Sequence, residues 1–449
     1  MKFTRHPKLI SGPLMRCFTL GVLAIGISSV RSAAQMPREL DLRTALTYAV
    51  DHNFAIRQAR ERIREQDGLV VEVKGAVLPN LALNGFYSVE DEALANAFTP
   101  DQNWQLSLQV TQLIYSGGGV RAALDVQDLV KESALLELET IINDQLLRAR
   151  TNFYNVLLAR EQIEVQEQNV GLFEEQLQTT KNRFEAGTVS NFEVLRAEVE
   201  LANAQPALIR ARNNHRVAID ELRYSLGYEE TNTVDVNRTP EIVGELEFTP
   251  VEYELETALQ SARLNRPELK QLETIRKARE AGLVIAKSNR RPTVSVNGGL
   301  ALRKDFGNSS FQGSRTGWTL GAAASWSIWD GASTNGRISQ ALSQQEQARL
   351  ALLDTSLAVE VEVRRALADL DGASELAAAA TKVVDQAEEA LRLANARYGA
   401  GTATQLDVLS AQVSLTSARN NLVEANYSYI VASASVRRAM GLSDVMISR

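Results

Sequence analysis

Two acidic residues stand at matching places where the sequence predicts a turn between two long helices. Glu193 follows the pair Gly187-Thr188, and Asp407 follows the pair Gly401-Thr402. A glycine after a helix permits the left-handed conformation that ends it, and an acidic residue in the next first turn favours the helix dipole. The spacings Ser-x-x-Glu and Thr-x-x-Asp that end at these residues are also those of capping boxes or close variants. Helix capping is therefore our main interpretation of both carboxylates, and cation binding is the alternative.

Other residue types that carry chemistry lack the necessary companions. Gly117-Gly118-Gly119 has no Lys-Ser/Thr after it, so it does not form a phosphate loop. His52 and His215 have no second ligand at metal-site spacing, and His215 falls in an apolar heptad series. Carboxylates are plentiful but none is singled out for acid-base work, and no nucleophile elbow, zinc signature or dinucleotide fingerprint is found. We predict that the chain is not an enzyme and has no cofactor or metal site.

The N-terminal segment 1–34 reads as a secretory signal. A basic start is followed by the apolar stretch from Cys17 to Val30 and by the small residues Ser32-Ala33-Ala34. Removal of this segment removes the only cysteine and five positive charges, so the net charge falls from -7 to -7 - 5 = -12. A chain this acidic is a poor partner for nucleic acid.

The rest of the chain is a tandem duplication. Asp41-Leu42-Arg43-Thr44-Ala45-Leu46 resembles Glu254-Leu255-Glu256-Thr257-Ala258-Leu259 at an offset of 254 - 41 = 213, and later matches hold at 214. We predict a first repeat at 35–227, an acidic connector at 228–253, a second repeat at 254–441 and a short tail at 442–449. Repeats of this length are far longer than those of solenoids.

Each repeat contains two segments with the pattern of membrane strands. Apolar and polar residues alternate from Trp104 to Val110 and from Trp318 to Ile328, and more weakly from Leu81 to Tyr87 and from Val294 to Leu302. After the signal there is no run of about 18 apolar residues that could form a transmembrane helix. Exposed strand edges are not tolerated in lipid, so we expect several chains to close one β-barrel. The tryptophans expected near the membrane interface are Trp104, Trp318, Trp326 and Trp329.

Long helices are the other strong signal. The stretch between Gly119 and Gly187 has no proline, and apolar residues recur every seven positions from Val156 to Phe184, as in a coiled coil. A helix of this size is roughly 100 Å long. The returning helix has its own series, which contains His215, and a shorter helix is expected over residues 42–77. The predicted fold class is thus a mixed α and β membrane protein.

As a set, these features resemble the TolC-type outer-membrane efflux protein family. The resemblance rests on the duplication, on Arg183-x3-Gly187 followed by Glu193-Val194-Leu195, and on Arg397-x3-Gly401 followed by Asp407-Val408-Leu409-x-Ala411. It covers nearly all of the chain after the signal. It implies a homotrimer with a twelve-stranded barrel in the outer membrane, four strands from each chain, and a twelve-helix tunnel in the periplasm. A periplasmic adaptor and an inner-membrane pump are the implied partners.

The resemblance also assigns roles to residues at the helical turns. The adaptor-docking tips it implies are Arg183, Gly187, Thr188, Arg397, Gly401 and Thr402. Three copies of Asp407 form an acidic ring at the periplasmic mouth in this interpretation, and Glu193 and Tyr398 lie beside it. Tyr398 matches a tyrosine that helps lock the closed mouth in the family, whereas Ala403 and Ser410 depart from its pattern. A closed mouth is therefore expected to be held differently here.

Three functions follow as hypotheses. The first is an exit channel for small molecules in a tripartite efflux system, and the second is the same duct serving type I protein secretion. The third, from another class, is a periplasmic coiled-coil adaptor or scaffold. Two helical hairpins and paired amphipathic strands favour the channel, because an adaptor is expected to carry one hairpin.

Overall fold

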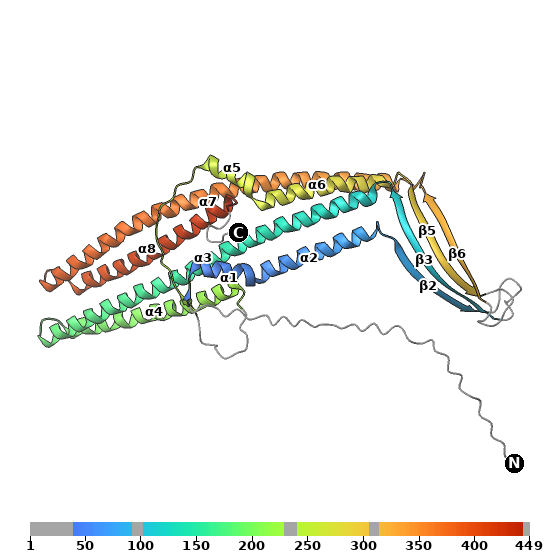
Figure 1. Cartoon of the computed structure of the whole chain (residues 1–449). Coiled ribbons are helices and arrows are strands. Elements are labelled where there is room, and N and C mark those ends of the chain that lie inside the picture. Colours follow the sequence, from blue (N-terminus) through green and yellow to red (C-terminus); the bar gives the residue numbers. More distant parts are fainter. Residues whose placement is uncertain (1–38, 92–101, 229–239, 305–313, 443–449) are drawn as a thin grey trace, which may run out of the picture.

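The protein is an elongated molecule with a sheet at one end and helical turns at the other (Figure 1). The computed structural model describes residues 39–91, 102–228, 240–304 and 314–442. The predicted signal, residues 1–34, lies outside them, as do residues 229–239 of the connector and 443–449 of the tail. Among the described residues, no helix is both long and apolar enough to cross a membrane.

Both repeats contain the same succession of helices and long strands. The first has β1 (Glu39–Leu40), α1 (Leu42–His52), α2 (Phe54–Gly75), β2 (Asn80–Val89), β3 (Gln102–Ser116), α3 (Gly119–Glu185) and α4 (Asn191–Leu226). The second has α5 (Leu255–Asn265), α6 (Pro267–Ser288), β5 (Thr293–Lys304), β6 (Ser314–Ser325), α7 (Ser333–Gly399) and α8 (Gln405–Ala439). The short strand β4 (Glu241–Ile242) belongs to the connector and pairs in parallel with β1. The mixed α and β fold predicted from the sequence is confirmed.

The larger sheet is antiparallel with the order β2-β3-β5-β6. Its register is duplicated, because the pairing of Leu83 with Leu108 between β2 and β3 recurs between their counterparts in β5 and β6. Side chains of directly opposed residues lie on one face of a sheet. One such row crosses all four strands and is apolar throughout: Leu83, Leu108, Leu300 and Trp318. One face of the sheet therefore carries a continuous apolar band.

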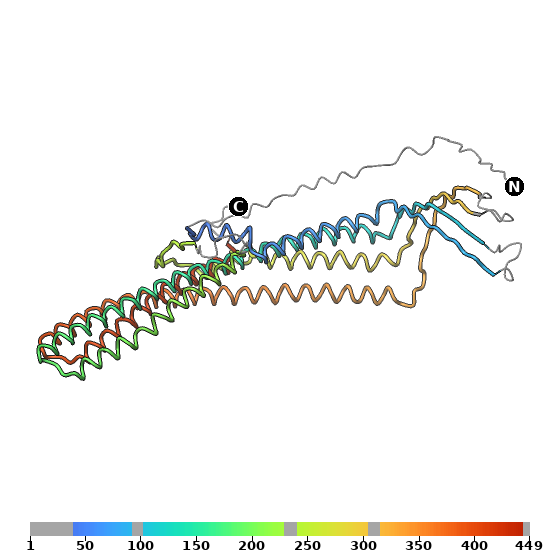
Figure 2. The backbone as a smooth tube through the Cα atoms, turned by 90° about the horizontal axis from the view of Figure 1, so that it is seen from below, coloured from blue at the N-terminus to red at the C-terminus, as the bar shows by residue number. Residues whose placement is uncertain are grey.

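The long helices run away from the sheet and fold back as hairpins. The helices α3 and α7 have 67 residues each, and α4 and α8 return along them (Figure 2). Toward the sheet α3 packs against α2 and α6, and toward the turns it packs against α4 and α8. The predicted long helices and their returning partners are thus present.

The shorter helix expected over residues 42–77 is instead two helices. Asn53 ends α1 and caps α2, because its side-chain oxygen accepts hydrogen bonds from the backbone N–H groups of Ala55 and Ile56. In the second repeat the break lies at Arg266, just before Pro267. The apolar pattern continues through both breaks, so it gave no sign of them.

The cores of the two repeats use matching positions. In the first repeat Ala45, Leu46 and Ala49 pack on α3 and α4. Their counterparts in the second repeat, Ala258, Leu259 and Ala262, pack on α7 and α8. Each set forms the midsection of its repeat. The short helices therefore brace the hairpins at the level where the connector crosses the molecule (Figure 1).

Candidate functional site at the helical turns

The two hairpin turns have the same backbone geometry. Gly187 and Gly401 have positive φ values of 73° and 74°, a conformation that glycine adopts without steric cost. The N–H groups of Thr188 and Thr402 donate to carbonyls five residues back, on Arg183 and Arg397, both at 2.9 Å. Their hydroxyl groups donate to these same carbonyls. The threonines and arginines of the predicted docking tips are therefore part of the turn itself.

Asp407 caps α8. Its Oδ2 accepts hydrogen bonds from the backbone N–H and the hydroxyl of Thr404, both at 2.8 Å, and the Asp407 N–H faces the Thr404 hydroxyl. The Thr404 donors, and more weakly the charge of Arg397, hold the pKa of Asp407 below its ordinary value. The capping box predicted here is present, and the exposed carboxylate is ionised at neutral pH.

Glu193 has a different environment, and the capping box predicted for it is wrong. Ser190 precedes α4 without a side-chain capping bond. Glu193 instead accepts a hydrogen bond of 3.4 Å from the hydroxyl of Tyr398, on the other hairpin. The two acidic positions of the repeat have therefore diverged.

Tyr398 joins the two turns. Only 7% of it is exposed, and the guanidinium of Arg183 lies 4.4 Å from its ring centre, within cation–π range. Arg183 also donates to the Tyr398 carbonyl oxygen at 3.3 Å. The structure thus brings together Arg183, Tyr398 and Glu193 from three helices, whereas Asp407 is bonded to the start of its own helix.

A buried polar seam continues from this cluster along α3 and α8. Its members recur every seven residues, Asn169 and Gln176 on α3 and Gln405 and Gln412 on α8, and each is less than a tenth exposed. Thr416 donates to the Asn169 side chain at 2.7 Å, but the Oε1 atoms of Gln405 and Gln412 have no partner among the described residues. Because the members of this seam are polar, the apolar heptads of the sequence did not predict it.

The tryptophans fall at the two ends of the sheet. Trp104 lies opposite Tyr87 and Trp318 opposite Leu300, toward the links between strands. Trp326 and Trp329 lie beyond the end of β6, which stops at Ser325, so the expectation of a strand through Ile328 is wrong for a single chain. An extended chain covers roughly 26 Å from Trp318 to Trp326, about the height of the apolar band of outer-membrane barrels.

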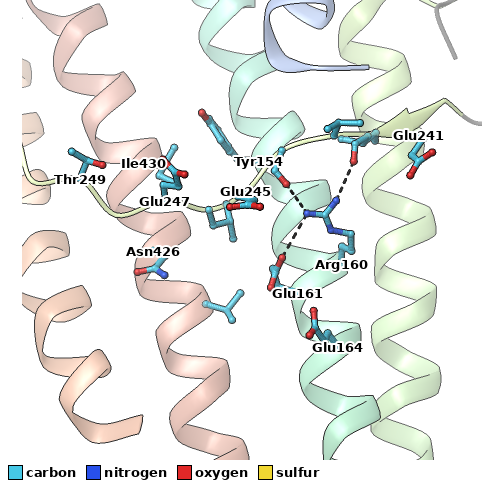
Figure 3. A pocket seen from close by; sticks show the side chains of 15 residues that line it. Tyr154, Arg160, Glu161, Glu164, Glu241, Glu245, Glu247, Thr249, Asn426 and Ile430 are labelled. Carbon is cyan, nitrogen blue, oxygen red and sulfur yellow. Dashed lines mark hydrogen bonds and ion pairs between the residues drawn. The ribbon is translucent and has the colours of Figure 1, made fainter. Parts of the chain in front are cut away.

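A separate cavity of 1210 Å³ lies where the connector crosses α3 and α8 (Figure 3). Arg160 of α3 holds the connector there by donating to the carbonyls of Ile242 at 3.1 Å and Gly244 at 2.6 Å. Partial burial and the Arg160 charge lower the pKa of His215. No group of three metal-ligating side chains occurs in the described residues, and the Arg160 contacts assign this region to fastening the connector.

Comparison with known proteins identifies the family. A profile described as "Outer membrane efflux protein" matches residues 46–228 and 258–442. Outer membrane protein TolC of Escherichia coli is 25% identical, with 82% of this chain and 76% of TolC covered. The alkaline protease secretion protein AprF of Pseudomonas aeruginosa is 24% identical, with 67% of this chain and 62% of AprF covered.

Solved structures show the same fold. The crystal structure of the Campylobacter jejuni CmeC outer membrane channel matches with a TM-score of 0.78 at 16% identity, over 89% of this chain and 85% of CmeC. Because the profile matches both repeats almost in full, the resemblance inferred from the turn motifs is confirmed. The chain belongs to the outer membrane efflux protein family.

Proposed function

We propose that three copies of this chain form the exit duct of a tripartite efflux system, which carries small molecules across the outer membrane. The main support for this proposal is that 67-residue helices continue directly from the strands of a four-stranded sheet, and that this sheet has an apolar band on one face. Leu83 and Trp318 of that band are 67% and 76% exposed. Exposed apolar area of this extent on a sheet favours contact with lipid.

The internal repeat supports the homotrimer. Within the chain α3 packs against α6 and α8. The counterpart of α3 in the second repeat is α7, and the counterparts of α6 and α8 in the first repeat are α2 and α4. If α7 of one copy packs against α2 and α4 of the next copy, the contact that α3 makes with α6 and α8 is repeated around a ring. Three chains then give a barrel of twelve strands and a tunnel of twelve helices in the periplasm.

The helical turns are the proposed periplasmic mouth. They lie at the end of the molecule farthest from the sheet (Figure 1). The adaptor docks on the exposed turns at Gly187-Thr188 and Gly401-Thr402, and the adaptor in turn contacts the inner-membrane pump. The contact of Tyr398 with Glu193 and Arg183 holds the two hairpins together in each copy, which narrows the mouth.

The second proposal for this site is a ring of three Asp407 carboxylates that favours cations. The carboxylate is charged at neutral pH, and the hydrogen bonds from Thr404 lower its pKa still further below the ordinary value of 3.8. Asp407→Ala is expected to reduce cation selectivity and the block of the pore by divalent cations. Asp385→Ala, which removes an exposed acidic residue of α7 away from the turn, is the matched control. Unchanged selectivity and block in Asp407→Ala contradict the ring.

The efflux function is tested in the native bacterium by deletion and complementation. Deletion is expected to raise the accumulation of fluorescent dyes and the sensitivity to toxic small molecules, and the intact gene is expected to restore both. Protein secretion is the second candidate, since the relative AprF is a protease secretion protein. Unchanged dye accumulation together with the loss of a secreted protein supports secretion instead.

A further inference from the structure

In the part of the chain that the structure describes, the sheet ends at two strands, β2 and β6, that each pair on one side only. The same chain shows how its two kinds of strand edge fit together, because β3 pairs with β5. In the second repeat the counterpart of β3 is β6, and in the first repeat the counterpart of β5 is β2. The pairing of β3 with β5 is therefore a template for the pairing of β6 with a second β2.

The counterparts β3 and β6 differ in length. The strand β3 has 15 residues and stays paired with β5 as far as Ser116 opposite Thr293, past an irregularity between Leu113 and Tyr115. The strand β6 has 12 residues and its ladder ends at Ser325. The last residues of β3, 112–116, pair with β5 and not with β2. Their counterparts in the second repeat, residues 326–330, are the ones that lie beyond the end of β6.

The segment after β6 nevertheless has the position of a strand. The indole N–H of Trp326 donates to the Arg290 carbonyl at 3.1 Å. Gln112, the counterpart of Trp326 in the first repeat, donates to the Val77 carbonyl at 2.9 Å, and Val77 is in turn the counterpart of Arg290. Residue 326 is therefore held as in β3, while Trp329 is 82% exposed.

We propose that β6 continues to Asp330 by antiparallel pairing with β2 of the neighbouring copy, in the register that β3 makes with β5. The pairing rests on the proposed trimer. Shifting the observed pairs places Ala322 opposite Tyr87 of the partner subunit and Trp326 opposite Leu83 of the partner subunit. The bulge of β3 recurs at Ile328, after which Trp329 lies opposite Leu81 of the partner subunit.

The side chains of the two edges are complementary in this register. Leu320, Ala322, Ala324 and Trp326 share one face, and they meet Val89, Tyr87, Gly85 and Leu83 of the partner subunit. The alanines thus leave room for the large ring of Tyr87 of the partner subunit. On the opposite face Ser325 meets Asn84 of the partner subunit. A slip by one residue places Tyr87 of the partner subunit on the face of Ser325, since side chains alternate along a strand.

Cysteine cross-linking tests the register directly, because the only cysteine, Cys17, lies in the predicted signal. The variant with Tyr87→Cys and Ala322→Cys is extracted as the intact assembly and oxidised. Covalent dimers and trimers are expected on non-reducing gels, because opposed residues in antiparallel strands lie within disulfide range. Variants that pair Ala322→Cys with Gly85→Cys or Val89→Cys are expected to cross-link roughly tenfold less, since diagonal positions exceed the usual Cα separation of a disulfide.

The pair Leu108→Cys and Leu300→Cys is the matched control, because these residues are the counterparts of Ala322 and Tyr87 and are paired within one chain. Stronger cross-linking at position 85 or 89 overturns the register. Absence of cross-links in all three variants, with the control fully oxidised, overturns the contact of β6 with β2. If the variants that fail to cross-link as expected still conduct ions in bilayers, the proposed pairing is wrong and the channel function stands. If they neither insert nor conduct, the channel function is contradicted as well.

Amide hydrogen exchange gives a second readout. Residues 326–330 are expected to exchange as slowly in the assembly as residues 112–116, their counterparts in β3. Fast exchange at 326–330 beside slow exchange at 112–116 overturns the extension of β6 even if the cross-links form.

Discussion

The two acidic residues of the turns act in different ways although they occupy matching positions. Asp407 bonds to Thr404 at the start of its own helix, whereas Glu193 accepts the hydroxyl of Tyr398 from the other hairpin. The first contact stabilises one helix end and the second joins two hairpins. Substitutions at the two positions are therefore expected to have separate effects.

For Asp407 the expected effect depends on pH. The folded-state pKa lies below the ordinary value of 3.8 because Thr404 donates two hydrogen bonds to the carboxylate. A lowered pKa stabilises the folded state above the ordinary value, and this stabilisation is lost as the pH falls through the folded pKa. Asp407→Asn is thus expected to speed amide exchange in the first turn of α8 at neutral pH, but not well below pH 3.8.

Asp385→Asn, at an exposed position within α7, is the control and is expected to leave that first turn unchanged. If amide exchange in this turn still differs between Asp407→Asn and the wild type at the lowest pH measured, the role of the ionised Asp407 side chain is contradicted.

For Tyr398 the expected effect is on opening. Tyr398→Phe removes the hydroxyl that donates to Glu193 but keeps the ring under Arg183. Loss of this tie is expected to raise the frequency of high-conductance openings in planar bilayers. Tyr224→Phe, at a residue that is 71% exposed, is the matched control. Equal opening frequencies in the Tyr398 and Tyr224 variants refute the tie.

At the scale of elements, the contact between α3 and α8 contains polar atoms that lack a partner among the described residues. Gln412 is 2% exposed and its Oε1 is one of these atoms, and its Nε2 reaches the Leu172 carbonyl only at 3.5 Å. A buried polar atom without a partner destabilises by about 1–3 kcal/mol. Gln412→Leu is therefore expected to raise the thermal unfolding temperature. The exposed Gln386→Leu is expected to change it little, and a lower temperature for Gln412→Leu contradicts the argument.

The break between α5 and α6 contains an ion-pair cluster around the buried Arg266. Arg266 is 2% exposed and bonds to Glu362 at 2.6 Å and Glu268 at 3.2 Å, and Arg438 joins the same carboxylates. Burial raises the pKa of Glu362, but the two arginines outweigh it and the net shift is downward. Arg266→Met is expected to destabilise the protein by about 1–3 kcal/mol, because Glu362 and Glu268 lose charged hydrogen bonds and keep only those from Arg438.

The control for Arg266 is Arg365→Met, whose side chain is 82% exposed and whose loss is expected to cost little. Chemical denaturation of the detergent-solubilised protein measures both variants. Similar stabilities of the two variants contradict a structural role for the cluster.

The regular elements could be predicted from the sequence, whereas their interruptions could not. The 67-residue helices follow from a seven-residue apolar repeat without proline, and the strands follow from alternation. The break at Asn53 depends on long-range bonds, since its side chain donates to the Ser225 carbonyl and to Gln145. The tie of Tyr398 to Glu193 likewise joins residues 205 positions apart, and no local pattern records such a contact.

At the scale of the whole molecule, the duplication explains the shape of the chain and its open edges. The register of β2 with β3 recurs in β5 with β6, and matching alanines and leucines form both midsection cores. An arc built from two equal repeats exposes at its two ends the kinds of surface that it joins in its middle. The sequence reveals the repeat. It does not reveal that β6 ends at Ser325 in the single chain, because the end of a strand depends on which strand lies beside it.

The central claim is that copies of this chain enclose a water-filled duct through the outer membrane. Conductance of the detergent-extracted mature protein in planar bilayers tests it most directly. Stable single-channel steps that prefer cations, with Asp407→Ala reducing that preference, are the predicted result. Folded mature protein that stays soluble without detergent and gives no steps in any variant, Tyr398→Phe included, contradicts the claim and favours a periplasmic scaffold.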